Sequence, residues 1–365
     1  MITGLSAGGA ENQLRLLLRH TVHDARVITL TNPGSVAAAI EAEGTRVDHL
    51  GMGGNRDVAS LPRLRAMIRR PACDIAHVHL YRSCLYGRLA ARLAGVRRVV
   101  TTEHSLGDGY IEGRRTTAGV RSLYLATERM SDATIAVSQA VRKHLIAWGV
   151  RSEKIVVVPN GVDFDSVAFD PVARSAARAE LGLPTNAFVV GALGRLEAIK
   201  RFDVLLRAAA PLLGSNVRLL VVGDGAMRRE LEHYAGQAKI QSHVVFTGER
   251  SSVGPLLSAM DLLVAPSASE TFGLAVVEAL GSGLPVLHAE CPALDALPDR
   301  GAPKARRVAA TERDLRQAIE AVMRTGGASD RAPVRSALER FGIQSCTRAT
   351  DRVYDSLTEP AGSLA

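Results

Sequence analysis

Three short segments of the sequence combine charged residues and glycines in patterns that are typical of ligand-binding or catalytic sites. The most informative is Ser269–Glu278, in which a glycine-containing loop with Glu270 leads into an apolar helical pattern that carries Glu278. A carboxylate aimed into a cleft can accept hydrogen bonds from sugar hydroxyls, and the free N–H groups that open a helix attract anions. A favourable charge near a helix N-terminus accounts for Glu278 alone, but it does not account for the loop before it.

The second segment, Gly194–Lys200, contains the two cations Arg195 and Lys200 and directly follows a predicted strand. At the carboxyl edge of a parallel sheet, two cations can hold a diphosphate and take up charge as it becomes a leaving group. The spacing alone fits a pair of solvated surface charges equally well.

The third segment is Ser6–Glu11, where Gly8 and Gly9 open a predicted helix. Glycines let a phosphate approach the backbone, and the helix N-terminus supplies N–H groups and a positive dipole. A pair of glycines before a helix is as often only a turn.

A pair of histidines, His77 and His79, lies on one predicted strand. Both rings point to the same face, which would permit a metal site. The sequence shows no third ligand, so we expect no metal there. His79, at the end of the strand, is the member expected to have a functional role.

Two successive series of strands alternate with helical patterns and must position these segments. Such alternation predicts α/β domains with doubly wound parallel sheets. We expect an N-terminal domain over 1–160, a linker over 161–184, a second domain over 185–340, and C-terminal helices over 341–365 that pack back towards the N-terminal domain. The predicted strands are Arg26–Leu30, Ile75–Leu80, Val99–Thr102, Ala133–Val137, Ile155–Val158, Phe188–Ala192, Val217–Val222, Val244–Thr247, Leu262–Ala265 and Pro285–Leu287.

The first strand of the N-terminal domain is anomalous, because only Ile2 and Thr3 precede Gly4. We expect either an unusually short strand or a native chain that begins upstream of Met1.

The composition excludes a disordered chain, since 47% of the 365 residues are hydrophobic and 22% are charged. No apolar run reaches the ~18 residues of a membrane span, and no signal peptide is evident. The four cysteines are scattered, without the spacing of a metal site or a redox pair, which fits a reduced compartment. We therefore expect a cytoplasmic protein. Met1–Val158 carries 22 Lys and Arg against 13 Asp and Glu. This basic half could meet an anionic membrane surface or a phosphorylated substrate; nucleic acid is not expected, with 4% aromatic residues.

Taken together, these motifs resemble the retaining glycosyltransferases of family 4, which have the GT-B fold. The resemblance covers most of the chain and includes the family's E-x7-E signature, Glu270 to Glu278. Its other marks are Gly8–Glu11, Asp74–His79, Thr102–His104, Val137–Ser138, Val158–Asp163, Arg195 with Lys200, Val222–Gly225 and Phe246–Gly248.

The resemblance implies two Rossmann-like domains whose parallel sheets face each other across a cleft. The N-terminal domain would hold the acceptor and the C-terminal domain a nucleotide sugar. Front-face displacement would retain the anomeric configuration without a metal. The implied contacts are Arg195, Lys200, Gly8 and Gly9 to the diphosphate; Glu270 with Thr271, Phe272, Gly273 and Leu274 to the donor sugar; Glu278 to the ribose; Arg250 beside the base; and His104 beside the anomeric carbon.

The loop after the next strand, His288–Leu294, departs from the Gly-Gly turn and Glu of many family members. Donor and acceptor are therefore predicted only as a hexose or N-acetylhexosamine, with UDP favoured over GDP, passing to a small-molecule or lipid-linked hydroxyl. Two alternatives stay open. One is a GT-B epimerase or phosphorylase, and the other is a non-catalytic nucleotide-sugar-binding protein.

Overall fold

The computed structural model describes residues 1–6, 8–70, 73–107, 109–111, 114–298, 301–326 and 330–358. The chain forms two compact units. The first contains Met1–Gly161 and the C-terminal segment from Ile343, and the second contains Val162–Gly342.

The second unit is built on a six-stranded parallel sheet with the order β12-β11-β10-β13-β14-β15. Its first strand, β10, pairs with β11 on one side and with β13 on the other, so the strand order reverses between β10 and β13. In doubly wound sheets, ligands bind at the carboxyl ends of the strands at this point of reversal. The strands are β10 (Phe188–Leu193), β11 (Val217–Val222), β12 (Val244–Phe246), β13 (Leu262–Ala265), β14 (Val286–His288) and β15 (Ala305–Arg307).

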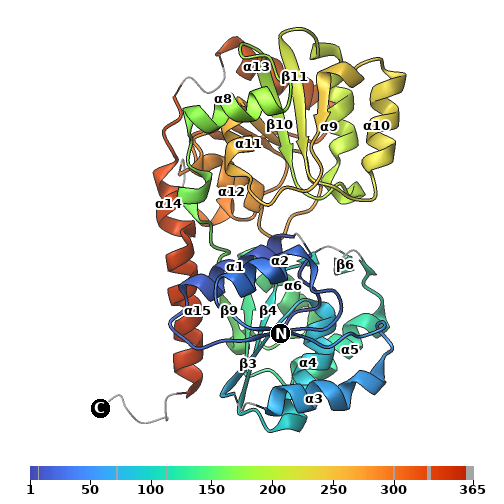
Figure 1. Ribbon diagram of the computed structural model, residues 1–365, viewed down its shortest axis with the longest axis vertical. Helices are drawn as coiled ribbons and strands as arrows, with labels where there is room; N and C mark the ends of the chain where they lie inside the picture. Colours follow the sequence, from blue (N-terminus) through green and yellow to red (C-terminus); the bar gives the residue numbers. More distant parts are fainter. Residues whose placement is uncertain are drawn as a thin grey trace. The chain divides into compact units, whose positions relative to one another are not determined.

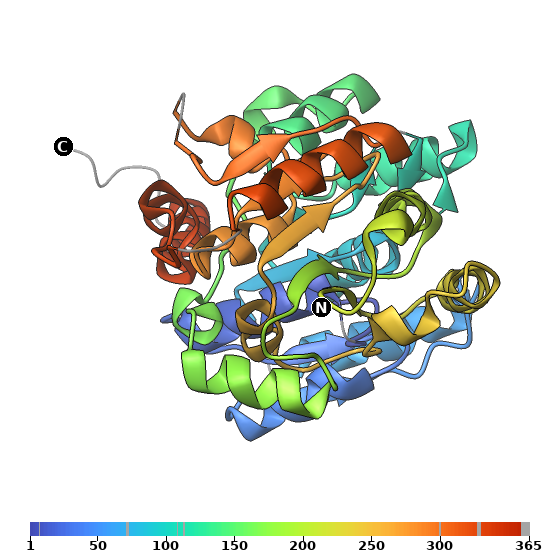
Figure 2. The same ribbon diagram turned by 90° about the horizontal axis from the view of Figure 1, so that it is seen from above.

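Helices cover both faces of this sheet, because its central strands are mostly apolar and need burial on both sides (Figures 1 and 2). One face packs against α9 (Phe202–Ala209), α10 (Arg228–Gln237) and α13 (Glu312–Arg324). The helices α8 (Pro171–Glu180), α11 (Gly254–Ala259) and α12 (Leu274–Gly281) belong to the other layer.

The first unit also contains a parallel sheet, in two parts. β1 pairs with β2, and a four-stranded part has the order β3-β4-β8-β9. Ile2 forms single bridges to Thr29 of β1 and His79 of β3, so the short first strand that the sequence predicts is one bridging residue. The strands are β1 (Val27–Thr29), β2 (Val47–His49), β3 (Ile75–His79), β4 (Arg98–Glu103), β8 (Ala133–Ala136) and β9 (Ile155–Val157).

The helices of the first unit alternate with these strands, as the βα pattern requires. Three short antiparallel strands, β5 to β7, interrupt the alternation within 106–115 and were not anticipated. No described helix is both long and apolar enough to cross a membrane. The helices are α1 (Gly9–His20), α2 (Gly34–Ala42), α3 (Leu61–Arg69), α4 (Tyr81–Ala94), α5 (Ala118–Glu128) and α6 (Gln139–Trp148).

The stretch 161–184, expected to be a linker, instead carries structure of the second unit. Its helix α8 packs on α11 and buries Arg178, whose guanidinium lies 2.7 Å from the Asp261 carboxylate. Burial of a paired arginine makes this segment part of a core, although its sequence is polar. At the other end, α14 (Arg335–Phe341) lies in the second unit, and α15 (Ile343–Thr358) packs on α1 in the first (Figure 1).

Candidate active site

An ion pair occupies the point of strand reversal in the second unit. The Nζ of Lys200 donates to Oε1 of Glu270 at 2.6 Å, and both side chains are mostly buried. Lys200 belongs to the loop after β10 and Glu270 to the loop after β13. The two loops also join through the backbone, where the Ala268 N–H donates to the Ile199 carbonyl at 3.1 Å. The structure thus brings together the two residues that the sequence places 70 positions apart.

The loop that carries Lys200 is anchored by contacts with the neighbouring loop, which follows β11. The Leu196 side chain is fully buried, and its N–H donates to the Asp224 carbonyl at 2.8 Å. Gly223 has a φ of +129°, and a Cβ there would overlap the Gly194 carbonyl oxygen. Arg195 lies exposed on this loop, and its guanidinium has no hydrogen-bond or ion-pair partner among the described residues. It is therefore a cation available to a ligand.

The loop after Glu270 is supported from β14. Gly273, the N-cap of α12, has a φ of +97°, and a Cβ there would collide with the Cys291 sulfur. The Cys291 thiol donates to the Phe272 carbonyl at 3.4 Å, and the Ala293 N–H donates to the same oxygen at 2.9 Å. Cys291 was not singled out from the sequence as a support for this loop. Its place after β14, next to β13 in the sheet, could have indicated it. Thr271 and Leu274 complete the turn into α12.

Glu278 lies on the first turns of α12, and none of the described residues forms an ion pair or hydrogen bond with its carboxyl group. Removal from water raises the pKa of Glu278 to about 7. Because this pKa is close to neutral pH, the carboxyl group can lose its proton when a polar ligand binds.

Arg250 follows β12, two strands away from β10. Its guanidinium lies 3.0 Å from the Glu180 carboxylate of α8, and both side chains are substantially exposed. An exposed ion pair contributes little free energy, so Arg250 can exchange Glu180 for another partner with little loss of stability.

In the first unit, Gly8 is the N-cap of α1 and Gly9 its first residue. The Glu11 carboxylate lies where a Gly8 side chain would be. The chain enters this glycine-lined turn from Ile2, which bridges β1 and β3 at Thr29 and His79.

His104 follows β4. Its Nε2 lies 3.1 Å from Nδ1 of His79, and its Nδ1 is buried without a partner among the described residues. Burial lowers the pKa of His104 to about 4, so the imidazole is neutral at pH 7. A neutral imidazole donates a hydrogen bond from one ring nitrogen and accepts one at the other.

His77 is engaged on both nitrogens. Its Nδ1 lies 2.6 Å from the Tyr354 hydroxyl and its Nε2 lies 2.7 Å from Oγ1 of Thr102. Both positions at which it could ligate a metal are therefore taken by hydrogen bonds, and its role is to attach α15 to the sheet.

Two family models match this chain, one for each unit. Residues 7–166 match the model of glycosyltransferase family 4, and residues 187–325 match the model of glycosyl transferases group 1.

Curated relatives agree with these matches. D-inositol 3-phosphate glycosyltransferase 1 of Catenulispora acidiphila is 33% identical over 277 residues, which span 68% of this chain and 65% of the relative. The UDP-Gal:alpha-D-GlcNAc-diphosphoundecaprenol alpha-1,3-galactosyltransferase of Escherichia coli is 30% identical over 240 residues, 64% of this chain and 62% of the relative. The alignments thus span less than two thirds of either relative's length.

Among solved structures, Anabaena Alr3699/HepE in complex with UDP-glucose superposes with a TM-score of 0.84 at 22% identity, over 97% of this chain and 99% of that one. This likeness shows the fold, which is GT-B with two Rossmann-like domains. The prediction of two doubly wound α/β domains is confirmed. The chain belongs to the glycosyltransferases of family 4.

Proposed function

We propose that this protein is a retaining glycosyltransferase that moves a hexose or N-acetylhexosamine from a nucleotide sugar, preferably a UDP-sugar, to a hydroxyl group of an acceptor. The observation that carries the proposal is the Lys200–Glu270 pair at the point of strand reversal, with the unpaired Arg195 on the same loop. The names of the E. coli relative and of the Anabaena complex support the choice of UDP.

The chemistry of the pair suits a diphosphate-linked sugar. An ammonium has three N–H donors, of which Lys200 gives one to Glu270 and keeps two for phosphate oxygens. Glu270 likewise keeps an oxygen to accept from sugar hydroxyls. Arg195 and Lys200 would stabilise the charge that gathers on the diphosphate as it leaves.

In the proposed reaction the acceptor oxygen forms a bond to the anomeric carbon on the face from which the diphosphate departs. The bond between that carbon and the phosphate oxygen breaks, and its electron pair goes to the phosphate. The acceptor proton passes to a phosphate oxygen, and the anomeric configuration is retained. Neutral His104 would hold a donor-sugar hydroxyl, and no metal ion takes part in the proposed steps. Positioning and cations supply the catalysis.

Two other functions would use the same fold. An epimerase would interconvert sugar nucleotides without an acceptor hydroxyl, and a phosphorylase would transfer a sugar to or from inorganic phosphate. A non-catalytic binding protein would hold the sugar nucleotide unchanged.

The testing experiment incubates the protein separately with UDP-, GDP-, dTDP- and ADP-sugars and follows slow hydrolysis by proton NMR, with and without EDTA. We expect selective hydrolysis of a UDP-sugar, the α-anomer appearing first and EDTA having no effect. Conversion to another sugar nucleotide would favour the epimerase. Neither turnover nor binding of any donor would contradict the proposal.

The acceptor is proposed to be either a small phosphorylated molecule or a lipid-linked glycan, since the curated relatives are named for one of each. The excess of cations in Met1–Val158 would favour an anionic acceptor or membrane surface in both cases. Co-sedimentation with anionic vesicles that is lost at high salt would favour the lipid-linked acceptor and peripheral membrane contact.

Donor binding should depend on pH through Glu278. Ribose hydroxyls donate to the ionised carboxylate, so binding should lower a pKa that is about 7 in the free protein. We expect the affinity for the nucleotide sugar to rise about tenfold between pH 6 and pH 8, with release of about half a proton per donor bound at pH 7. Calorimetry in buffers of different ionisation enthalpy measures both.

The matched variant is Glu278→Gln, in which this pH dependence should vanish. The free energy of unfolding depends on pH in the opposite direction to the donor affinity. Because the folded pKa lies above the ordinary value of 4.5, the folded state binds more protons between pH 4.5 and about 7, and its stability falls as the pH rises through that range. The melting temperature of the Gln variant should lack this fall. Equal pH profiles for the two proteins would contradict the assignment.

A further inference from the structure

The first unit buries an arginine completely between its sheet and two helices. Arg88 of α4 has no exposed surface, and its guanidinium stays charged in a protein interior. Its Nε donates to Oγ1 of Thr101 on β4 at 3.0 Å, and its Nη1 donates to Oγ1 of Thr127 on α5 at 3.2 Å. Its Nη2 has no hydrogen-bond partner among the described residues. A buried cation costs free energy unless an anion balances it, so Arg88 needs a carboxylate nearby.

Glu103 is a buried acid on the same face of β4. Side chains alternate along a strand, so Thr101 and Glu103 point to the same side of the sheet, towards Arg88. Glu103 has no exposed surface. Burial raises the pKa of its carboxyl group, and the bond from the Ser105 N–H and the positive charge of Arg88 partly offset this. The two charges therefore act on each other without a direct ion pair.

Tyr124 of α5 interacts with both charges. The guanidinium carbon of Arg88 lies 4.6 Å from the centre of the Tyr124 ring, a cation–π arrangement. The Tyr124 hydroxyl, which is also buried, acts to lower the pKa of Glu103. Nη2 of Arg88, the Tyr124 hydroxyl and Oε2 of Glu103 each lack a hydrogen-bond partner among the described residues. The three residues thus form a buried polar cluster that offers a donor, a hydroxyl and an acceptor, a set that one water molecule can bridge.

Glu103 uses its other oxygen to hold the turn that follows β4. Oε1 accepts from the Ser105 N–H at 3.1 Å and from the Ser105 hydroxyl at 3.4 Å. His104 is the residue between them, so the carboxylate restrains the backbone on both sides of His104. Hydrogen bonds to an ionised acceptor are roughly twice as strong as neutral ones. The position of His104 therefore depends on whether Glu103 carries its charge.

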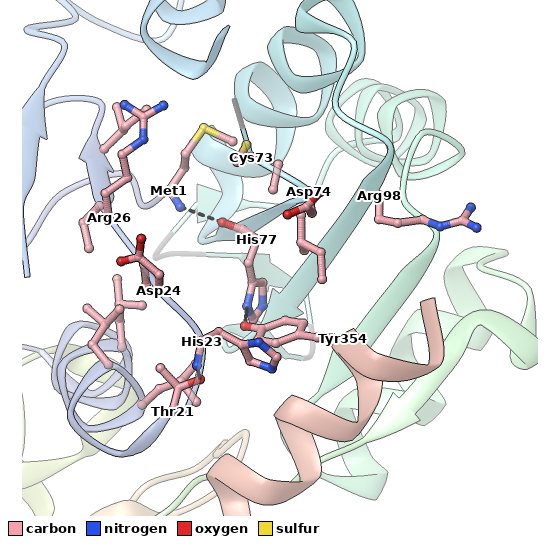
Figure 3. A pocket seen from close by; sticks show the side chains of 18 of the residues that line it. Met1, Thr21, His23, Asp24, Arg26, Cys73, Asp74, His77, Arg98 and Tyr354 are labelled. Carbon is pink, nitrogen blue, oxygen red and sulfur yellow. Dashed lines mark hydrogen bonds between the residues drawn. The ribbon is translucent and has the colours of Figure 1, made fainter. Parts of the chain in front are cut away.

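The ring of His104 is restrained separately, by histidines whose side chains point to the other face of the sheet. Nδ1 of His79 lies 3.1 Å from its Nε2, and the ring centres of His79 and His77 are 4.1 Å apart. His77 in turn points towards Tyr354 of α15, with which it lines a cavity (Figure 3). These contacts orient the imidazole, whereas Glu103 restrains the backbone that carries it.

We propose that the buried polar cluster positions His104 for the reaction: its cation balances the Glu103 carboxylate, and this carboxylate fixes the turn. The three members are positioning residues, because none of them touches substrate in the proposed reaction. An apolar cluster of similar volume would join α4, α5 and β4 at least as well, but it could not hold the Ser105 N–H with a charged acceptor. The inference rests on the proposed function, in which His104 holds a hydroxyl of the donor sugar.

The test compares Glu103→Gln with a matched control, Glu128→Gln. Glu128 of α5 is also buried and also acts on the charge of Arg88, but it accepts from the Thr134 hydroxyl, at 3.2 Å. Each glutamine removes one buried charge and keeps an oxygen for the hydrogen bond. We expect Glu103→Gln to lower kcat for the best donor at least about tenfold and to change KM less than about twofold, because a displaced His104 alters the reacting geometry. Glu128→Gln should leave kcat unchanged.

Arg88→Met tests the other end of the cluster. Loss of the cation should lower kcat by a similar factor, and the double variant with Glu103→Gln should lower it little further, because the two residues act as a unit. Single effects that multiply in the double variant would overturn the proposal. Tyr124→Phe removes only a hydroxyl and should lower kcat about threefold, and it replaces Arg88→Met if circular dichroism shows that variant to be unfolded.

Amide hydrogen exchange at Ser105 reports on the turn independently of activity. It should be at least about tenfold faster in Glu103→Gln than in the unaltered protein, and unchanged in Glu128→Gln. Equal losses of kcat in the two glutamine variants would overturn the proposal, since the charges would then serve stability only. Faster exchange in a chain that turns over no donor would contradict the proposed function alone. A normal rate of turnover in folded Glu103→Gln would overturn this inference alone.

Discussion

Replacement of Lys200 by alanine is expected to lower the turnover of nucleotide sugar at least about 100-fold, the scale on which a single lost transition-state contact acts. The ammonium sits at the carboxyl edge of the sheet and keeps N–H donors beyond the one that Glu270 accepts. Its loss would remove a cation from the leaving diphosphate and leave the mostly buried Glu270 carboxylate unpaired. Steady-state kinetics with the best donor measure the effect.

Glu270→Ala should cost a similar factor, and the double variant should cost little more than either single one, because the two residues act as a unit. The matched control is Arg335→Ala, which breaks the exposed pair of Arg335 with Glu339 on α14 of the same unit and should leave turnover unchanged. Circular dichroism establishes that each variant is folded. Near-normal rates in both single variants would refute the placement of the site.

The proximity of Lys200 to Glu270 could be predicted only in part. Both loops follow predicted strands, so both belong to the carboxyl edge of a sheet. The hydrophobic pattern does not show that β13 lies beside β10 rather than at the end of the sheet, because every buried parallel strand has the same apolar signature. The resemblance to family 4 placed both residues around one donor molecule, but it did not predict the ion pair between them.

Two central strands of the second unit have the bounds that the sequence predicts, Val217–Val222 and Leu262–Ala265. Both are mostly apolar and mostly buried, and such short apolar runs favour a buried strand. The edge strand β15, Ala305–Arg307, was missed because its two arginines are exposed and carry no apolar signature. The helix α2, Gly34–Ala42, was missed because it is apolar nearly all round and lacks the period of an amphipathic helix.

The segment before β10 shows why the linker prediction was wrong. Its arginines look like surface charges in the sequence, but Arg174 and Arg178 both bind Asp261, which lies just before β13. Asp261 comes beside these arginines only in the folded chain. The polar composition therefore suggested a solvent-exposed segment, whereas the structure contains a mostly buried network of ion pairs there.

The backbone that holds Lys200 should be as sensitive as the side chain itself. Gly223→Ala is expected to destabilise the second unit by at least about 2 kcal/mol, through an unfavourable positive φ and overlap with the Gly194 carbonyl. Relief of the overlap would push the loop of Arg195 and Lys200 away from β11. We therefore also expect KM for the nucleotide sugar to rise at least about tenfold, from the loss of one good contact.

The control for this variant is Gly236→Ala, in the last turn of α10, where a Cβ meets nothing within 4 Å. Alanine there should leave KM unchanged and stabilise the helix by roughly 0.5–1 kcal/mol, since glycine is the poorer helix former. Thermal melting and donor kinetics on the two variants separate a general effect of added methyl groups from the specific contact between the two loops. If Gly223→Ala melted like Gly236→Ala and kept its KM, the loop after β11 would not be what positions Lys200.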